Sequence, residues 1–191
     1  FDLLDDLKNK KARSASLEAI LKNHSNFYAG VKSVLQESER LGGIVGAVSE
    51  KLSFDPHYQT ALEIALGASS QNIIVEDEAA ATRAIDFLKK NRAGRATFLP
   101  LTTIKPRQLA DHHRTSIESS KGFLGLASSL VTYEASLDTI FQNLLGTTAI
   151  FDTVDNARAA ARQVRYQVRI VTLDGTELRT GGSYAGGANK N

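Results

Sequence analysis

The sequence predicts an α/β (α+β) protein of two similar halves, preceded by a helix of coiled-coil type. Three observations support this prediction: a heptad-spaced apolar seam near the N-terminus, short apolar runs that alternate with amphipathic segments, and an internal repeat. The 191 residues are enough for one or two domains with a proper core. With 42% hydrophobic and 23% charged residues, the composition is that of an ordinary globular protein.

The first 35 residues carry the seam. Ten positions follow one another at alternating steps of four and three, and seven of them are apolar: Leu3, Leu7, Lys10, Ser14, Leu17, Leu21, His24, Tyr28, Val31 and Leu35. A helix with so little apolar surface is marginal alone, so we expect it to need a partner helix. Glycine destabilises a helix by about 1 kcal/mol relative to alanine. We therefore expect a break between Asn26 and Gly30, then a second helix from Val31 to about Glu39.

The first half alternates strands and helices. Residues 42–48 predict a loop that enters a strand, residues 73–75 a buried strand, and residues 95–100 a strand that ends at proline. Two helices are predicted between these strands. The first helix has Asp55 as its cap and Pro56 in its first turn, and it ends at Gly67; its apolar face holds Tyr58, Leu62, Ala65 and Leu66. The second helix starts in acidic residues 76–78, where the helix dipole favours negative charge. Its apolar face holds Ala80, Ala84, Ile85 and Leu88.

The second half repeats this order at an offset of 79 residues. Tyr133-Glu134 and Gly146 correspond to Phe54-Asp55 and Gly67, while Thr139 and Phe141 correspond to Thr60 and Leu62. Residues 149–151, 156–163 and 168–173 then predict a strand, an alanine-rich helix and a further strand. Asp174-Gly175 is typical of a hairpin turn. We divide the chain into a coiled-coil arm (1–38), a first subdomain (39–101), a polar connector (102–121) and a second subdomain (122–191).

Composition excludes several classes of function. The chain has no cysteine, which excludes disulfide scaffolds, thiolate metal sites and cysteine nucleophiles. The net charge of +2 is too small to indicate nucleic acid by itself, and no run approaches the roughly 20 apolar residues of a membrane span. Because Phe1 stands where a natural chain has methionine, we expect a fragment of a longer protein.

No catalytic motif is complete. Gly182 to Gly187 has the spacing of a phosphate-binding loop, but Ala188-Asn189 stands where that loop needs Lys-Ser/Thr. Ser183 fails the nucleophile pattern GxSxG because Ala185 takes the last glycine position. His112 and His113 follow Asp111 in a polar segment and predict a solvated loop rather than a metal site. We expect no catalytic centre, metal or cofactor in this fragment.

Two features remain. Residues 181–187 contain four glycines, which fits either a flexible tail or a strand edge against which another backbone packs closely. Composition alone favours the tail. The second feature is a run of six cations without an acid: Lys89, Lys90, Arg92, Arg95, Lys105 and Arg107. Such a run is either a solvated helix end or a patch for phosphate backbones.

Several segments together resemble the hinge domain of bacterial structural-maintenance-of-chromosomes (SMC) proteins. The resemblance runs in order from about Phe27 to the end and rests on residues 41–46, 58–67, 94–101, 144–146, 169–175 and 181–187. Thr180 departs from the family, in which proline usually precedes the paired glycines. We expect this change to loosen the turn and to leave the glycines in place.

The resemblance implies two pseudo-symmetric subdomains and a head-to-head homodimer. The glycine-rich strand of one subunit would meet the first subdomain of its partner, with dimer contacts at Gly181, Gly182, Ser183, Tyr184, Gly186 and Gly187. Either residues 43–48 or residues 95–99 could receive it. The resemblance also implies DNA binding near the coiled coil, with Lys89 and Lys90 as first candidates and Arg92 and Arg95 as second.

For the full-length protein, the resemblance implies an ATPase head absent from this chain, a long antiparallel coiled coil, and a role in chromosome condensation and segregation. Such a protein is cytoplasmic and nucleoid-associated, has no membrane partner, and binds condensin accessory subunits away from the hinge. An alternative is a duplicated α/β domain that binds or converts a small molecule, which would need a polar pocket with perturbed ionisable groups. A plain coiled-coil adaptor is a third, less compatible with two α/β halves.

Overall fold

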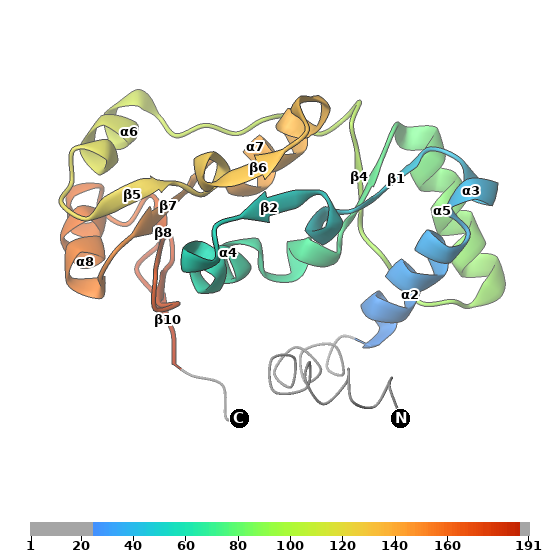
Figure 1. Ribbon diagram of the computed structural model, residues 1–191, viewed down its shortest axis with the longest axis horizontal. Helices are drawn as coiled ribbons and strands as arrows, with labels where there is room; N and C mark the ends of the chain where they lie inside the picture. The colour runs from blue at the N-terminus through green and yellow to red at the C-terminus, as the bar shows by residue number, and fades with distance from the viewer. Residues whose placement is uncertain (1–24, 188–191) are drawn as a thin grey trace.

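The computed structural model describes residues 25–187, which form an elongated body with one sheet in each half (Figure 1). The heptad positions from Leu3 to His24 and the last four residues lie outside the described part. Short 3₁₀ helices are labelled η. The first half contains α2 (Ser25–Gln36), α3 (Ser38–Leu41), β1 (Ile44–Ala47), η1 (Val48–Glu50), β2 (Leu52–Phe54), η2 (Pro56–Tyr58), α4 (Gln59–Leu66), η3 (Gly67–Gln71), β3 (Ile73–Val75), α5 (Glu78–Asn91) and β4 (Phe98–Pro100).

The second half repeats the first with two additions. It contains α6 (Asp111–Glu118), β5 (Phe123–Leu126), η4 (Ala127–Leu130), β6 (Val131–Tyr133), η5 (Ala135–Leu137), α7 (Asp138–Leu145), β7 (Thr148–Phe151), α8 (Val154–Gln163), β8 (Arg169–Thr172), β9 (Glu177–Leu178) and β10 (Tyr184–Ala185). The bounds of β1, β2 and α4 recur 79 residues later in β5, β6 and α7, which confirms the predicted repeat. Strands β9 and β10 are additions to the second half.

The two sheets share a common core of three strands. The first sheet has the order β1-β3-β4, and the second has the order β10-β9-β8-β7-β5. In both, the first strand of the half is antiparallel to the middle strand and the last is parallel to it. The register shifts beside Gly46 in β1 and beside Gly125 in β5, where φ is +146° and +153°. The repeated glycines therefore make the same β-bulge in each half.

The halves join through a two-stranded antiparallel sheet of β2 and β6, at the centre of Figure 1. Ser53 lies opposite Thr132, and these two residues occupy the same position of the repeat. Leu52 lies opposite Tyr133, and Phe54 lies opposite Val131. An approximate two-fold axis therefore passes between Ser53 and Thr132 and relates one half to the other.

Three apolar clusters form the core. The largest lies between the halves and contains Leu62 of α4, Phe141 of α7 and the middle strands' Ile74 and Ile150. The second lies under α8 in the second half, and the third lies between α2, α5 and the first sheet.

Two helix-capping side chains lie where the sequence predicts helix starts. The carboxylate of Asp55 accepts the N–H of His57 at 2.8 Å. Asp77 accepts the N–H of Ala80 at 2.8 Å, which starts α5.

The predicted helix break near Gly30 is wrong, because α2 runs without interruption from Ser25 to Gln36. Gly30 is buried, and a Cβ built on it would lie 2.0 Å from the carbonyl oxygen of Arg95. The missing side chain lets the helix rest directly on the backbone that precedes β4. The glycine therefore serves packing, and the helix ends later, at a turn around Glu37 before α3.

Three smaller expectations also differ from the structure. The strand predicted for residues 95–100 begins only at Phe98, since the preceding loop is occupied by its contact with α2. Ile85 is 38% exposed, so the buried face of α5 consists of Ala80, Ala84 and Leu88. The polar connector holds α6, whose Ile117 is buried in the second-half core.

Replacement Gly30→Ala tests the close approach of α2 to Arg95. On an exposed helix this change stabilises by about 1 kcal/mol, whereas forcing a methyl group into a packed site costs about 1–3 kcal/mol. Because the opposing atoms are backbone, we expect net destabilisation. Urea unfolding followed by circular dichroism measures it, with Lys32→Ala on the exposed side of α2 as control. An unchanged or higher unfolding midpoint for Gly30→Ala would contradict the packing role.

Candidate association edge and basic patch

Residues 181–187, here called the association edge, contain β10, the outermost strand of the second sheet, and the turn that leads into it. The N–H of Arg179 donates to the carbonyl of Ser183 at 2.8 Å, and that of Gly182 donates to the carbonyl of Arg179 at 3.0 Å. This turn lays Tyr184 beside Leu178 and Ala185 beside Glu177. Tyr184 and Ala185 therefore form an edge strand rather than a free tail. The role of these residues in dimerisation stays a prediction, because the structure holds one chain.

The outer side of β10 has free backbone groups. In an antiparallel pair, alternate residues direct their N–H and C=O groups to the same neighbour. The carbonyl of Ser183 accepts from Arg179, the residue that follows β9, so Tyr184 and Gly186 direct their backbone groups away from that strand. Within the described chain β10 is the last strand of its sheet. It therefore offers a short template for another strand.

The glycines of the association edge have few neighbours in this chain. Gly181, Gly182 and Gly187 have φ of +93°, +104° and +127°, and a Cβ on any of them meets nothing within 4 Å. Gly186 has no positive φ, and its Cβ would lie 3.4 Å from Thr176 Oγ1. Packing inside the described chain therefore does not require glycine at these positions. Backbone conformation favours it at three of them.

Tyr184 joins the edge to the end of α8. Its side chain is 44% exposed, and its hydroxyl lies 2.7 Å from the hydroxyl of Tyr166. The hydrogen bond with Tyr166 raises the pKa of Tyr184 above its usual value of 10.0. Sequence patterns did not reveal Tyr166, because it lies 18 residues before Tyr184 in the chain and its own segment carries no motif.

Arg169 of β8 links the second half to the first. Its guanidinium donates to the carbonyl oxygens of Ile64 and Ala65, at 2.9 and 2.8 Å, in the last turn of α4. Those carbonyls have no partner within the helix, and the helix dipole favours a cation beside them. Glu177 of β9 accepts from Arg169 at 2.6 Å and from Arg179 at 3.1 Å. Sequence patterns missed this link because its partners are about 105 positions apart.

Burial tends to raise the pKa of Glu177, but hydrogen bonds and charge from Arg169 outweigh this effect. Arg179 acts in the same direction, and the pKa of Glu177 lies below its ordinary value of 4.5. The side chain is only 13% exposed. Glu177 is therefore a carboxylate that stabilises the folded state in its ionised form.

The four predicted DNA-binding residues lie at one end of the first half. Lys89 and Lys90 occupy the last turn of α5, Arg92 follows as its left-handed C-cap with φ of 47°, and Arg95 lies in the loop toward β4. All four are exposed. None takes part in an ion pair within residues 25–187. We call them the basic patch.

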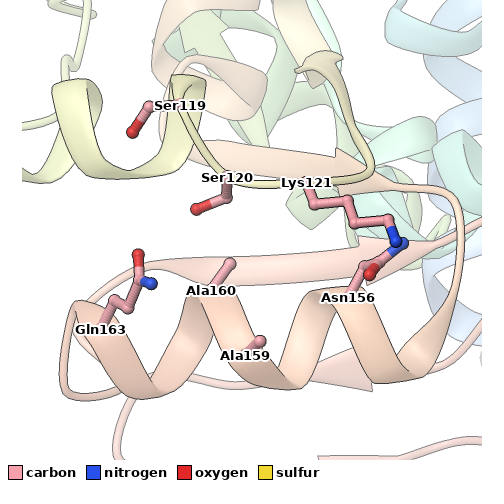
Figure 2. A pocket seen from close by; sticks show the side chains of 7 residues that line it. All are labelled: Ser119, Ser120, Lys121, Asn156, Ala159, Ala160 and Gln163. Atoms are coloured by element: carbon pink, nitrogen blue, oxygen red, sulfur yellow. The ribbon is translucent and has the colours of Figure 1, made fainter.

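Features considered for catalysis do not converge. His112 and His113 lie in α6 rather than in the predicted loop, with ring centroids 4.1 Å apart. No group of three potential metal ligands occurs in the described range. A hollow of about 260 Å³ lies between helix α8 and the segment that follows α6. Figure 2 shows the side chains that line it: Ser119, Ser120, Lys121, Asn156, Ala159, Ala160 and Gln163. No helix among residues 25–187 has the length and apolar character needed to cross a membrane.

The fold and its open edges define a class of protein: a duplicated α/β body attached to a helix, with an unpaired strand edge in each half. Residues 41–161 match the family described as the SMC proteins flexible hinge domain. The chain belongs to this family. The match favours a hinge over the duplicated small-molecule domain that the sequence left open.

Relatives extend the match beyond that segment. The chain is 45% identical over 184 residues to the chromosome partition protein Smc of Bacillus subtilis, and 42% identical over 184 residues to that of Lactiplantibacillus plantarum. Each alignment covers 96% of this chain and 16% of the relative. The chain therefore spans about one sixth of the length of these curated relatives.

Solved structures agree in fold. An asymmetric dimer of the Geobacillus stearothermophilus SMC hinge domain is 40% identical, with a TM-score of 0.82, over 96% of this chain and 75% of that chain. The Pyrococcus furiosus SMC hinge domain is 31% identical, with a TM-score of 0.67, over 82% and 78% of the two chains. The predicted fold class, two pseudo-repeated halves of a hinge, is confirmed.

Replacement Glu177→Gln tests the link between the halves through its pH dependence. The folded pKa of Glu177 is depressed, so its stabilisation is complete above the unfolded pKa near 4.5 and disappears as pH falls through the lower folded pKa. At pH 7 we expect the free energy of unfolding of the variant to be about 1–3 kcal/mol below that of the wild type. As the pH falls, the free energy of unfolding should decrease less in the variant than in the wild type. Urea unfolding at fixed protein concentration from pH 7 to 3 measures both effects.

The control is Glu63→Gln, because Glu63 is exposed on α4 and its carboxylate accepts only from Gln59 within the described chain. Parallel pH profiles of wild type and Glu177→Gln would show that the carboxylate contributes nothing in its ionised form.

Proposed function

We propose that this chain joins two copies of an SMC protein that acts in chromosome condensation and segregation. The association edge of each copy pairs with the first sheet of the other. One observation carries the proposal: the second sheet continues past β8 into β9 and β10, whereas the equivalent side of the first sheet ends at β4. The similarity to a hinge domain crystallised as an asymmetric dimer supports self-association.

Strand β4 is the better acceptor of the two open borders of the first sheet. The repeat makes β4 the equivalent of β8, whose outer side already takes an added strand, β9. Thr97 and Leu101 bond to β3, so alternation directs the backbone groups of Phe98 and Pro100 outward. Pro100 offers only a carbonyl, which suits an edge position. This short acceptor matches a two-residue donor such as β10.

Two such contacts close a symmetric dimer. A two-fold axis that brings β10 of one copy to β4 of the other also brings the second β10 to the second β4. Tyr184, Ser183 and the glycines Gly181, Gly182, Gly186 and Gly187 then lie at the contact. Side chains in place of those glycines would strain the edge where φ is positive and would add bulk on the faces of the joined sheet.

In the full-length protein, α2 would continue the ingoing coiled-coil arm, and an outgoing arm would begin after Gly187. The arms would lead to ATPase heads outside this chain, so that two joined chains enclose DNA. We place the protein in the cytoplasm at the nucleoid, and accessory subunits of condensin type away from the hinge. The similarity to chromosome partition proteins supports this assignment.

We further propose that the basic patch binds DNA. Its four cations are exposed and lie close together in the chain, and the backbone of one of them, Arg95, packs against Gly30 of α2. Free cations contact phosphates and release counterions, which drives association without sequence preference. Lys89 and Lys90 are the first candidates for phosphate contacts, because both are exposed in the last turn of α5.

Replacing Gly181, Gly182, Gly186 and Gly187 together by alanine tests the association edge. We expect a folded chain with a dimer dissociation constant raised about a hundredfold or more, since steric crowding of 1–3 kcal/mol would act at both contacts. Sedimentation equilibrium over a wide concentration range measures the constant. A variant that stays dimeric at every concentration would refute pairing through this edge.

Two further variants separate crowding from backbone strain. Gly67→Ala introduces alanine at a φ of +55° where a Cβ meets nothing within 4 Å, so it should weaken folding and leave the dimer intact. Gly186→Ala adds a methyl group without a positive φ, so it should weaken the dimer and leave folding intact.

Charge reversal Lys89→Glu with Lys90→Glu tests the basic patch. We expect weaker binding to duplex DNA, and a slope of log K against log salt that flattens by about 0.9 for each phosphate that the variant no longer neutralises. Fluorescence anisotropy with labelled DNA at several salt concentrations provides both numbers. The control, Arg114→Glu with Lys121→Glu, changes the net charge equally on exposed residues of the other half. Equal weakening in both variants would assign the effect to net charge alone.

A further inference from the structure

The end of α8 has a strained backbone that faces the association edge. Arg165 and Tyr166 are consecutive non-glycine residues with φ of 54° and 57°. The backbone of an L-residue other than glycine rarely adopts this left-handed conformation, and the conformation persists only where surrounding contacts enforce it. Here the N–H of Tyr166 donates to the carbonyl of Ala161 at 2.8 Å, and that of Arg165 donates to Arg162 at 3.1 Å.

This conformation lets Tyr166 hold the edge at two points. Its carbonyl accepts the N–H of Gly181 at 3.0 Å, where the edge begins. Its hydroxyl bonds to the hydroxyl of Tyr184 at 2.7 Å, within β10, and the two ring centroids are 6.1 Å apart. The ring of Tyr166 packs against the second-half core, so both contacts start from a fixed position.

The edge needs such support. Strand β10 has two residues and pairs with another two-residue strand. Gly182 lies two positions before it and Gly186 directly after it, and these glycines leave the unbound backbone many conformations. A strand that must be ordered during association loses affinity, whereas one already ordered keeps it.

We infer that Tyr166 is a positioning residue for self-association, which holds β10 where it pairs with a second copy of this chain. The inference rests on the proposed dimer. It assigns to Tyr166 no contact with the partner: the residue acts through Gly181 and Tyr184. Because the hydroxyl contact is one interaction shared by two tyrosines, removing either hydroxyl removes it entirely.

The test compares Tyr166→Phe, Tyr184→Phe and the double variant with the wild type. Removing one hydrogen bond changes an equilibrium about threefold to tenfold, and two contacts per dimer multiply this to roughly tenfold to hundredfold in the dissociation constant. We expect each single variant and the double variant to weaken the dimer equally. Amide exchange of the monomer at low concentration should quicken at residues 183–186 and stay unchanged in α8.

Tyr58→Phe is the matched control, because Tyr58 lies in the first half and its hydroxyl has no hydrogen bond within residues 25–187. A wild-type dimer that Tyr166→Phe leaves unchanged would overturn the inference and leave the proposed dimer standing. Additive effects of the two replacements would also overturn it, because each hydroxyl would then act separately. A monomeric wild type would overturn the dimer and the inference together. Should Tyr166→Phe fold poorly, Tyr184→Phe removes the same bond from the exposed side.

Discussion

The antiparallel pairing of β2 with β6 is the constraint on which the rest of the structure depends. It sets Ser53 opposite Thr132, its equivalent in the repeat, and so fixes the two halves about an approximate two-fold axis. The central apolar cluster lies against this pairing and contains buried residues from both α4 and α7. The rings of Tyr133 and Phe141 stack, with 4.6 Å between their centroids. Neither half can bury that surface alone. The remaining edges of both sheets are therefore held at fixed places on either side of the centre (Figure 1).

The proposed functions lie where the duplication is broken. Helix α5 of the first half has 14 residues, and its last turn carries Lys89 and Lys90. The equivalent helix of the second half, α8, has 10 residues. The second half adds β9 and β10 outside β8, whereas the chain leaves β4 through the connector. Identical halves would present identical edges. In the proposed dimer, these differences would give one half a donor strand and leave the other with an open acceptor.

Local sequence could predict the repeat, the buried strands and the capped helices, because each follows from residues close in the chain. Gly67 and Asp77 end and start their helices as their residue types require. The error at Gly30 has the opposite origin: its role depends on Arg95, 65 positions away, and helix propensity gives no sign of that neighbour. For the same reason the contacts of Arg169 with α4, and of Tyr166 with β10, could not be found before the fold was known. The composition of residues 181–187 likewise allowed a tail or an edge, and only β9 decides between them.

In the proposed dimer, short edges suffice because they act in pairs. Each contact between β10 and β4 involves few backbone hydrogen bonds, each contributing about 0.5–1.5 kcal/mol, so one contact alone is weak. Once the first contact forms, the second becomes intramolecular, and its effective concentration is set by the rigid body between the edges. The β2–β6 pairing and the shared apolar core join the two halves into that body. In the proposed dimer, the loss of one contact would still leave the other to join the two chains, which a single edge would not allow.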